Sequence, residues 1–321
     1  MRTLRLEIWI GLGVILALSV VSLGVGVIKL SWEQAFSDPE ALRVLIVSRL
    51  PRTLAVLITG AVLAMAGIIL QAIVRNRFVE PMTTGTGQGA ALGILLATIL
   101  IPTAPLILRM GLAATTALAA SLGFLAIVRR LPINQPLLVP LVGLIYGALL
   151  GAVSVFFAYQ FDLQQSIAIW TTGEFSGVLK GRYELLWLAA LAGGLVYLIA
   201  DQLAIIGMGQ TMATGLGVNY RQIMAAGLLV ISLVTALTVV TVGMIPFVGL
   251  VVPNIISRRY GDNLRQTLPL VALTGAGLVL ISDILGRILR FPFEIPVGSV
   301  FGVIGAVFFL MILYSSSRSA Y

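Results

Sequence analysis

Apolar residues occur along this chain in long, nearly continuous runs separated by short polar stretches. A helix of about 20 apolar residues is long enough to cross the hydrocarbon core of a bilayer. The segment 246–256, which contains Pro253, is too short to cross alone as a regular helix. The chain therefore predicts an all-α integral membrane protein of about ten helices, as one transmembrane domain over residues 1–321. The predicted segments are 8–28, 44–74, 84–101, 106–128, 137–159, 185–200, 223–242, 246–256, 268–289 and 297–314.

Two longer polar stretches interrupt this pattern. Residues 161–184 are expected to form a short interfacial helix and a loop on the outer side of the membrane. Residues 201–222 are too polar to span, yet amphipathic enough to form short helices on the cytoplasmic side. The N-terminal run at 8–28 is longer than the apolar core of a signal peptide, which is about 7–15 residues. We therefore expect a retained first span, with a signal peptide as the minor alternative.

Composition supports this class and removes others. Hydrophobic residues make up 59% of the chain and charged residues 10%, whereas soluble domains carry about 25% charged residues. There is too little polar surface for a water-soluble fold, and too much apolar surface for intrinsic disorder. No Lys/Arg-rich stripe with interleaved aromatic residues is present, so nucleic acid is not an expected partner.

The formal net charge of +8 follows in part from topology. Basic residues are enriched in cytoplasmic loops of membrane proteins. With both termini in the cytoplasm, a slight majority of the basic residues fall inside. They include the pairs Arg75/Arg77, Arg129/Arg130 and Arg258/Arg259. The remaining outer arginines need another explanation.

Residue types that carry most enzymatic chemistry are missing. The chain contains no Cys and no His, which removes thiolates, imidazole bases and the commonest metal ligands. It also lacks a phosphate-binding P-loop, a nucleophile elbow, a zinc motif and an EF-hand loop. We therefore predict no catalytic residue and no metal site, and a membrane-embedded enzyme is the least favoured class.

Asp283 is the main acidic residue within an apolar segment. Arg287 follows at i+4, so a helix places the two side chains side by side. An internal ion pair is the favoured interpretation. The alternative is an ion-coupling carboxylate of a secondary transporter.

Glycines recur at helical spacing in two segments, at Gly85/Gly89/Gly93 and Gly143/Gly147/Gly151. Small residues at this spacing let helix backbones approach closely in lipid. Tight packing is the favoured interpretation. The alternative is a smooth ridge that leaves room for bulky cargo beside a transport path.

Four stretches occur in an order typical of one transporter family. They are SRLPRTLAVLITGAVLAMAGIILQAIVRNRFVEP (48–81), TGLGVNYRQ (214–222), the stretch from GMIPFVGLVVPNIISRRYGD to the Asp283 helix (243–289), and FEIPVGSVFGVIGAVFFLMIL (293–313). Together they resemble the FecCD family of ABC importer permeases for ferric siderophores, haem and cobalamin. Residues 77–96 look nearest to the ferric-siderophore branch. Asn254 stands where the family usually has His.

The resemblance implies a fold and a set of partners. It implies the type II ABC importer permease fold, like that of the cobalamin importer, in the cytoplasmic (inner) membrane of a bacterium. The partners would be membrane lipid, a second permease subunit, two cytoplasmic ATPase subunits and a periplasmic or lipid-anchored substrate-binding protein. A heterodimer with a paralogue is favoured over a homodimer. ATP and Mg would be held by the ATPase, and no cofactor by this chain.

The resemblance also implies roles for particular residues. In the stretch 201–222, the coupling segment, glycines would permit a tight turn, apolar side chains would contact the ATPase, and Arg221 would pair with an acidic partner. The coupling residues are Ala213, Thr214, Gly215, Leu216, Gly217, Val218 and Arg221. The residues for docking of the binding protein are Arg49, Arg52 and Arg290, with snorkelling to lipid headgroups as the alternative.

Residues of the translocation path are the least specified by the resemblance. The turn Pro81–Gly85 and the loop 131–138 are the candidate inner gate. The candidate path residues are Met82, Thr83, Thr84, Gly85, Gln88, Gly89, Leu138, Tyr146, Ser299 and Phe301.

Overall fold

The structure is a computed structural model that describes residues 2–26, 38–131 and 137–318. Every regular element in those ranges is helical. The helices are α1 (Arg2–Gly24), α3 (Pro39–Val44), α4 (Leu50–Val74), α5 (Thr86–Leu100), α6 (Leu106–Val128), α7 (Leu138–Gln160), α8 (Gln164–Thr171), α9 (Leu186–Val196), α10 (Ala200–Gly207), α11 (Gln210–Gly215), α12 (Tyr220–Val242), α13 (Val248–Tyr260), α14 (Leu264–Ile288) and α15 (Val297–Arg318).

Helix length and hydropathy confirm the predicted class. Among the described residues, seven helical stretches are long and apolar enough to cross a membrane, and the shorter helices at Thr86–Leu100 and Val297–Ile312 are also apolar. The number of ten crossings stays a prediction. The sixth predicted segment ends at residue 200, but its helical stretch continues to Gly207, because a 3-10 turn at Tyr197–Ile199 joins α9 to α10 without a break. The first residues of the segment 201–222, which was predicted to form short cytoplasmic helices, therefore continue this helical stretch to Gly207.

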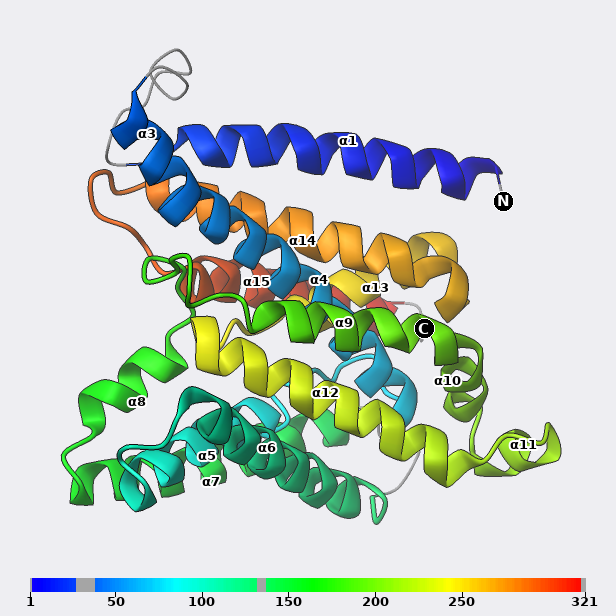
Figure 1. The fold of residues 1–321 in the computed structure, drawn as a ribbon. Coiled ribbons are helices and arrows are strands. Elements are labelled where there is room, and N and C mark those ends of the chain that lie inside the picture. Colours follow the sequence, from blue (N-terminus) through cyan, green and yellow to red (C-terminus); the bar gives the residue numbers. More distant parts are fainter. Residues whose placement is uncertain (1, 27–37, 132–136, 319–321) are drawn as a thin grey trace.

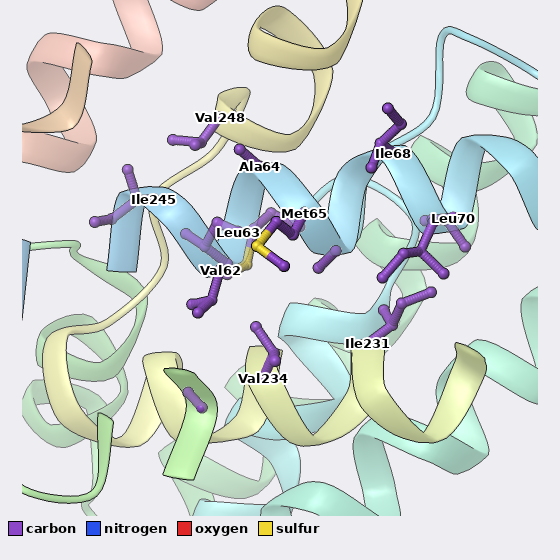
Figure 2. Close-up of a cluster of buried hydrophobic side chains, with 14 of the residues drawn as sticks. Val62, Leu63, Ala64, Met65, Ile68, Leu70, Ile231, Val234, Ile245 and Val248 are labelled. Carbon is purple, nitrogen blue, oxygen red and sulfur yellow. The ribbon is translucent and has the colours of Figure 1, made fainter. Parts of the chain in front are cut away.

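Helix α4 forms the centre of the core. In its most apolar stretch 78% of the residues are buried, against 6% in α1. It contacts α9, α12, α13 and α14, and Figure 1 shows it crossing the middle of the bundle beside α14. Figure 2 shows apolar side chains of α4, from Val62 to Leu70, facing Ile231 and Val234 of α12 on one side and Val248 of α13 on the other.

Glycines let α4 approach its neighbours at backbone distance. A Cβ atom on Gly67 would collide with the carbonyl oxygen of Gly249 in α13, and one on Gly60 with that of Gly275 in α14. Because backbone atoms cannot move aside, only glycine fits at these crossings. Sequence inspection did not single out these two pairs.

The predicted glycine ridges serve packing in part. A Cβ on Gly89 would lie 2.6 Å from the Cβ of Ala120, and one on Gly93 would collide with Thr116, so α5 packs closely on α6. Gly151 of α7 faces open space, because a Cβ added there would meet no atom within 4 Å. The packing interpretation holds for α5.

The two ends of the bundle differ. Figure 1 shows α10, α11 and the start of α1 at one end, and α3 and α8 at the other. At the α3 end, Pro51 has no N–H to donate within its helix. The N–H of Lys180 donates to the carbonyl of Val47 instead (2.9 Å). This bond ties the polar segment 161–184 to the start of α4.

Candidate functional site

Four charged side chains form a network at the α3 end of the bundle. The Nη2 of Arg52 lies 2.8 Å from Oδ1 of Asp283, and its Nη1 lies 2.9 Å from Oε2 of Glu294. The other oxygen of Asp283 pairs with Nη2 of Arg287 at 2.6 Å. Asp283 is fully buried, so it exchanges hydration for two guanidinium partners.

Two arginines of this region also bind the end of α1. Arg287 donates through Nη1 to the carbonyls of Ser22 (2.9 Å) and Val25 (2.8 Å). Arg49 donates to the carbonyls of Leu23 (2.6 Å) and Gly24 (3.2 Å). The last carbonyls of a helix lack partners and carry its negative dipole end. The guanidinium groups donate hydrogen bonds to these carbonyls, and their positive charge faces the negative end of the helix dipole. They thereby join α1 to the start of α4 and to α14.

The structure thus places the predicted docking arginines in different environments. Arg49 is 7% exposed, and the side chain of Arg52 is 13% exposed. Arg290 is exposed, with its guanidinium 5.8 Å from the ring centroid of Phe293. Of the three, Arg290 presents its charge most openly to a partner.

Asp283 forms the internal ion pair that was favoured over an ion-coupling role. The predicted i, i+4 pair with Arg287 is present, and Arg52 is an additional partner that sequence inspection did not find. Each carboxylate oxygen lies within ion-pair distance of a guanidinium group, as expected for an internal ion pair.

Residues 76–85 form an irregular segment between α4 and α5. Its backbone groups need partners from outside the segment. Gln71 donates to the carbonyls of Val79 (3.3 Å) and Gly249 (3.1 Å). Asn254 of α13 donates to the carbonyl of Arg77 (2.8 Å). Asn254 therefore holds this segment in place.

Glu80 is the residue of this segment that sequence inspection missed. The residue is 1% exposed, and its Oε1 accepts the N–H of Phe247 at 2.6 Å. Phe247 precedes α13 with a φ of 70° and provides no side-chain cap. Glu80 therefore supplies from a distant segment the acceptor for the N-cap N–H that a Glu at the third helical position provides in a capping box. A lone acidic residue before Pro81 in an apolar context was the available signal.

Several candidate path residues lie together beyond Glu80. Thr84 is buried and donates through Oγ1 to the carbonyl of Glu80 (2.8 Å). Gly85, with a φ of 89°, packs against Tyr146 so closely that a Cβ would lie 2.7 Å from the ring. The Oε1 of Gln88 would lie 3.5 Å from a Cβ on Gly147. The start of α5 and α7 therefore face each other here. Met82 and Gly89 are buried, and Thr83, Gln88 and Leu138 are half-buried.

The remaining path candidates lie elsewhere. Ser299 is exposed and Phe301 is buried, both at the start of α15. There Gly298 donates its N–H to the carbonyl of Gly173 (2.8 Å), which ties α15 to the 161–184 segment. Residues 132–136 of the candidate gate loop lie outside the described residues.

The coupling segment 201–222 contains α10, α11 and the start of α12. Left-handed backbone occurs at Gly209 (φ 108°) and Gly217 (φ 77°). Gly215 ends α11, so the turn depends on Gly217 and not on Gly215. Ala213 is fully buried and its carbonyl accepts the N–H of Val218 (2.9 Å).

The outer surface of this segment is apolar at several points. Met208, Met212 and Leu216 are each about 60% exposed, and Thr214 and Arg221 are also exposed. Exposed apolar side chains rimmed by polar residues are typical of a contact surface for another protein. The geometry here is suited to docking of a partner.

Comparison with known proteins gives this geometry a context. The sequence pattern of the FecCD transport family matches residues 14–315. The chain is 42% identical to the ferric-anguibactin transport system permease protein of Vibrio anguillarum, over 94% of this chain and 96% of that protein. It is 42% identical to a petrobactin import system permease protein of Bacillus subtilis, over 96% of this chain and 97% of that protein.

A solved structure supports the same assignment. A metal-chelate type ABC transporter in an inward-facing conformation aligns with a TM-score of 0.79 and 27% identity, covering 97% of this chain and 99% of that chain. The chain therefore belongs to the FecCD transport family.

Proposed function

We propose that this protein is the permease subunit of an ATP-driven importer of ferric siderophores. The observation that carries the proposal is the similarity, over nearly the whole chain, to permeases named for ferric anguibactin and petrobactin. The absence of a P-loop from the sequence fits a subunit that forms a path while another hydrolyses ATP.

The assembly proposed here has several parts. The chain crosses the cytoplasmic (inner) membrane about ten times with both termini inside, and pairs with a paralogous permease. Two ATPase subunits, which hold ATP and Mg, dock at α11 and the turn after it through Ala213–Val218 and Arg221. A binding protein delivers cargo at the opposite end, where Arg290 is exposed and Arg49 and Arg52 lie below the surface.

The proposed path is formed by the pair of permeases, and in this chain it is bordered by the start of α5 and by α7. The buried or half-buried side chains of Met82, Thr84 and Tyr146 would line it, with the Pro81–Gly85 turn as the inner gate. Few charged side chains lie there, which suits a bulky chelate that must not be held tightly on its way through.

Uptake by proteoliposomes tests this proposal. The complete transporter is supplied inside with MgATP and outside with the binding protein and radiolabelled ferric petrobactin, haem or cobalamin. We expect uptake of the ferric siderophore alone, abolished by vanadate and unaffected by an ionophore. Uptake that persists without ATP under an ion gradient would instead identify a secondary transporter, and uptake of haem or cobalamin alone would move the protein to another branch.

A further inference from the structure

Helix α13 is shorter than the helices that cross the bilayer. Its 13 residues span about 20 Å at 1.5 Å per residue. Its first residues, from Val248 to Leu250, are fully or almost fully buried. The helix therefore starts inside the protein and runs to the end of the bundle at which α10 and α11 lie (Figure 1).

The buried end of α13 is bonded to the irregular segment 76–85. Phe247 donates its N–H to Glu80, and Asn254, further along the helix, donates to the carbonyl of Arg77. Gln71 bridges the two parts by donating to Val79 and Gly249. These bonds attach the segment 76–85 to α13 at three separate points.

Glu80 is unusual among these contacts because it is acidic. Among the described residues it forms no ion pair, and its Oε2 has no hydrogen-bond partner. A buried carboxyl without a cationic partner is costly. The positive end of the α13 dipole is the compensation that the structure offers. An ionisable residue kept at such a place in a membrane protein indicates a role in function.

The other end of α13 borders a cavity of about 490 Å³. Gly207 and Met208, at the end of α10, lie on one side of the cavity, and Pro253 and Ser257 of α13 lie on another. Helix α10 is therefore not packed tightly against α13, and it has room to move toward it. Because α10 is part of the coupling segment, such a movement would act on α13.

We propose that α13 transmits displacement of the coupling segment to the irregular segment 76–85, and that Glu80 is the positioning residue that makes this segment follow α13. The inference rests on the proposed function, since it requires an ATPase that moves the coupling segment. When α10 closes on α13, the bonds from Phe247 and Asn254 carry Glu80 and Arg77 with the helix. The Pro81–Gly85 turn moves with them.

The chain contains no cysteine, so introduced cysteines are the sole attachment sites for spin labels in this subunit. We choose Thr83 in the turn, Ser257 on α13, and Leu122 on α6 as an outside reference, all in the transporter assembled with its ATPase. Pulsed electron paramagnetic resonance measures the distances with and without MgATP and vanadate. We expect the Thr83–Leu122 distance to change by several ångströms on trapping and the Thr83–Ser257 distance to stay constant.

Variants of Glu80 separate positioning from stability. Glu80→Gln keeps an oxygen acceptor for Phe247, so the Thr83–Ser257 distance should stay constant as in the wild type. Glu80→Leu has no acceptor, so this distance should change or broaden on trapping. Thr59→Val is the matched control, because Thr59 is fully buried and its Oγ1 is unpartnered within the described residues. It should behave as the wild type.

A Thr83–Leu122 distance that stays unchanged on trapping would overturn the inference, and so would either of two further results. One is a Thr83–Ser257 distance that changes on trapping in the wild type, a result that does not depend on any variant folding. The other is a Glu80→Leu protein whose distances respond as in Glu80→Gln. The distances are measured without cargo, so a transporter that traps ATP but imports no ferric siderophore refutes the proposed cargo and leaves the α13 result standing. A chain that assembles with no ATPase overturns both.

Discussion

Asp283 of α14 and Arg52 of α4 are 231 positions apart in the sequence and 2.8 Å apart in the structure. The carboxylate is fully buried, and its second oxygen pairs with Arg287. Since Arg287 also binds the last carbonyls of α1, a single acidic side chain is the centre of the contact among three helices. Glu294 extends the network to the segment that leads into α15.

Replacing Asp283 with Asn should strongly destabilise the protein. The change leaves Arg52 and Arg287 buried without their shared charge, and breaking a buried pair in this way costs about 3–5 kcal/mol. The melting temperature in detergent measures the effect. Asp262→Asn is the control, because its pair with Arg77 is exposed on both sides and should contribute little. Equal melting temperatures for the two variants would contradict this account.

Reversing the charge of Arg290 should slow the docking of the binding protein. The guanidinium is exposed, so Arg290→Glu alters the surface without breaking an internal pair. We expect an association rate about tenfold lower at low salt, with the difference largely lost at high salt because exposed charges are screened. Surface plasmon resonance at several salt concentrations measures it. An association rate equal to the wild type at low salt would exclude Arg290 from the docking surface.

Arg52→Glu is a less direct test of docking. It removes the partner of Asp283 and places a third carboxylate beside Glu294, so loss of binding would not distinguish docking from disruption of the network. The burial of Arg49 and Arg52 is the reason that Arg290 is the sharper probe, although sequence inspection treats the three as equivalent.

Helix crossings at glycine should be intolerant of even one methyl group. Gly67→Ala places a Cβ against the backbone carbonyl of Gly249, which cannot move without shifting α13. Overpacking of this kind costs about 1–3 kcal/mol or more. Gly111→Ala is the control, since a Cβ at that position would meet no atom within 4 Å. A Gly67→Ala protein as stable as Gly111→Ala would show that α4 and α13 do not cross as described.

The sequence predicts local features of this fold well. Long apolar runs identify the helices because a chain in hydrocarbon must pair its backbone N–H and C=O groups with each other, and a helix does so within one segment. The Asp283–Arg287 pair follows from i, i+4 spacing on a helix. Arg52 as the second partner of Asp283 could not be predicted, because helical periodicity carries no information on which distant helices meet.

The same limit applies to the candidate site. Glu80 and Phe247 are 167 positions apart, and the irregular segment between α4 and α5 has no periodic pattern to interpret. In the coupling segment, the family resemblance implied a glycine turn, with Gly215 and Gly217 as equal candidates. Gly217 has the left-handed backbone, whereas Gly215 is helical, because a short segment fixes neither the length of α11 nor its end.

A bulky residue at position 215 should uncouple ATP hydrolysis from import without harming the fold. A Cβ on Gly215 meets no atom within 4 Å, so the indole of Gly215→Trp projects from the end of α11 toward the proposed ATPase and disturbs the contact that couples hydrolysis to import. We expect import and cargo-stimulated ATPase activity to fall by at least about tenfold, equivalent to about 1.4 kcal/mol, at an unchanged melting temperature. Gly194→Trp is the matched control, because Gly194 of α9 also has an open Cβ position but lies within an apolar span. Normal cargo-stimulated hydrolysis in Gly215→Trp would show that α11 is not a coupling element.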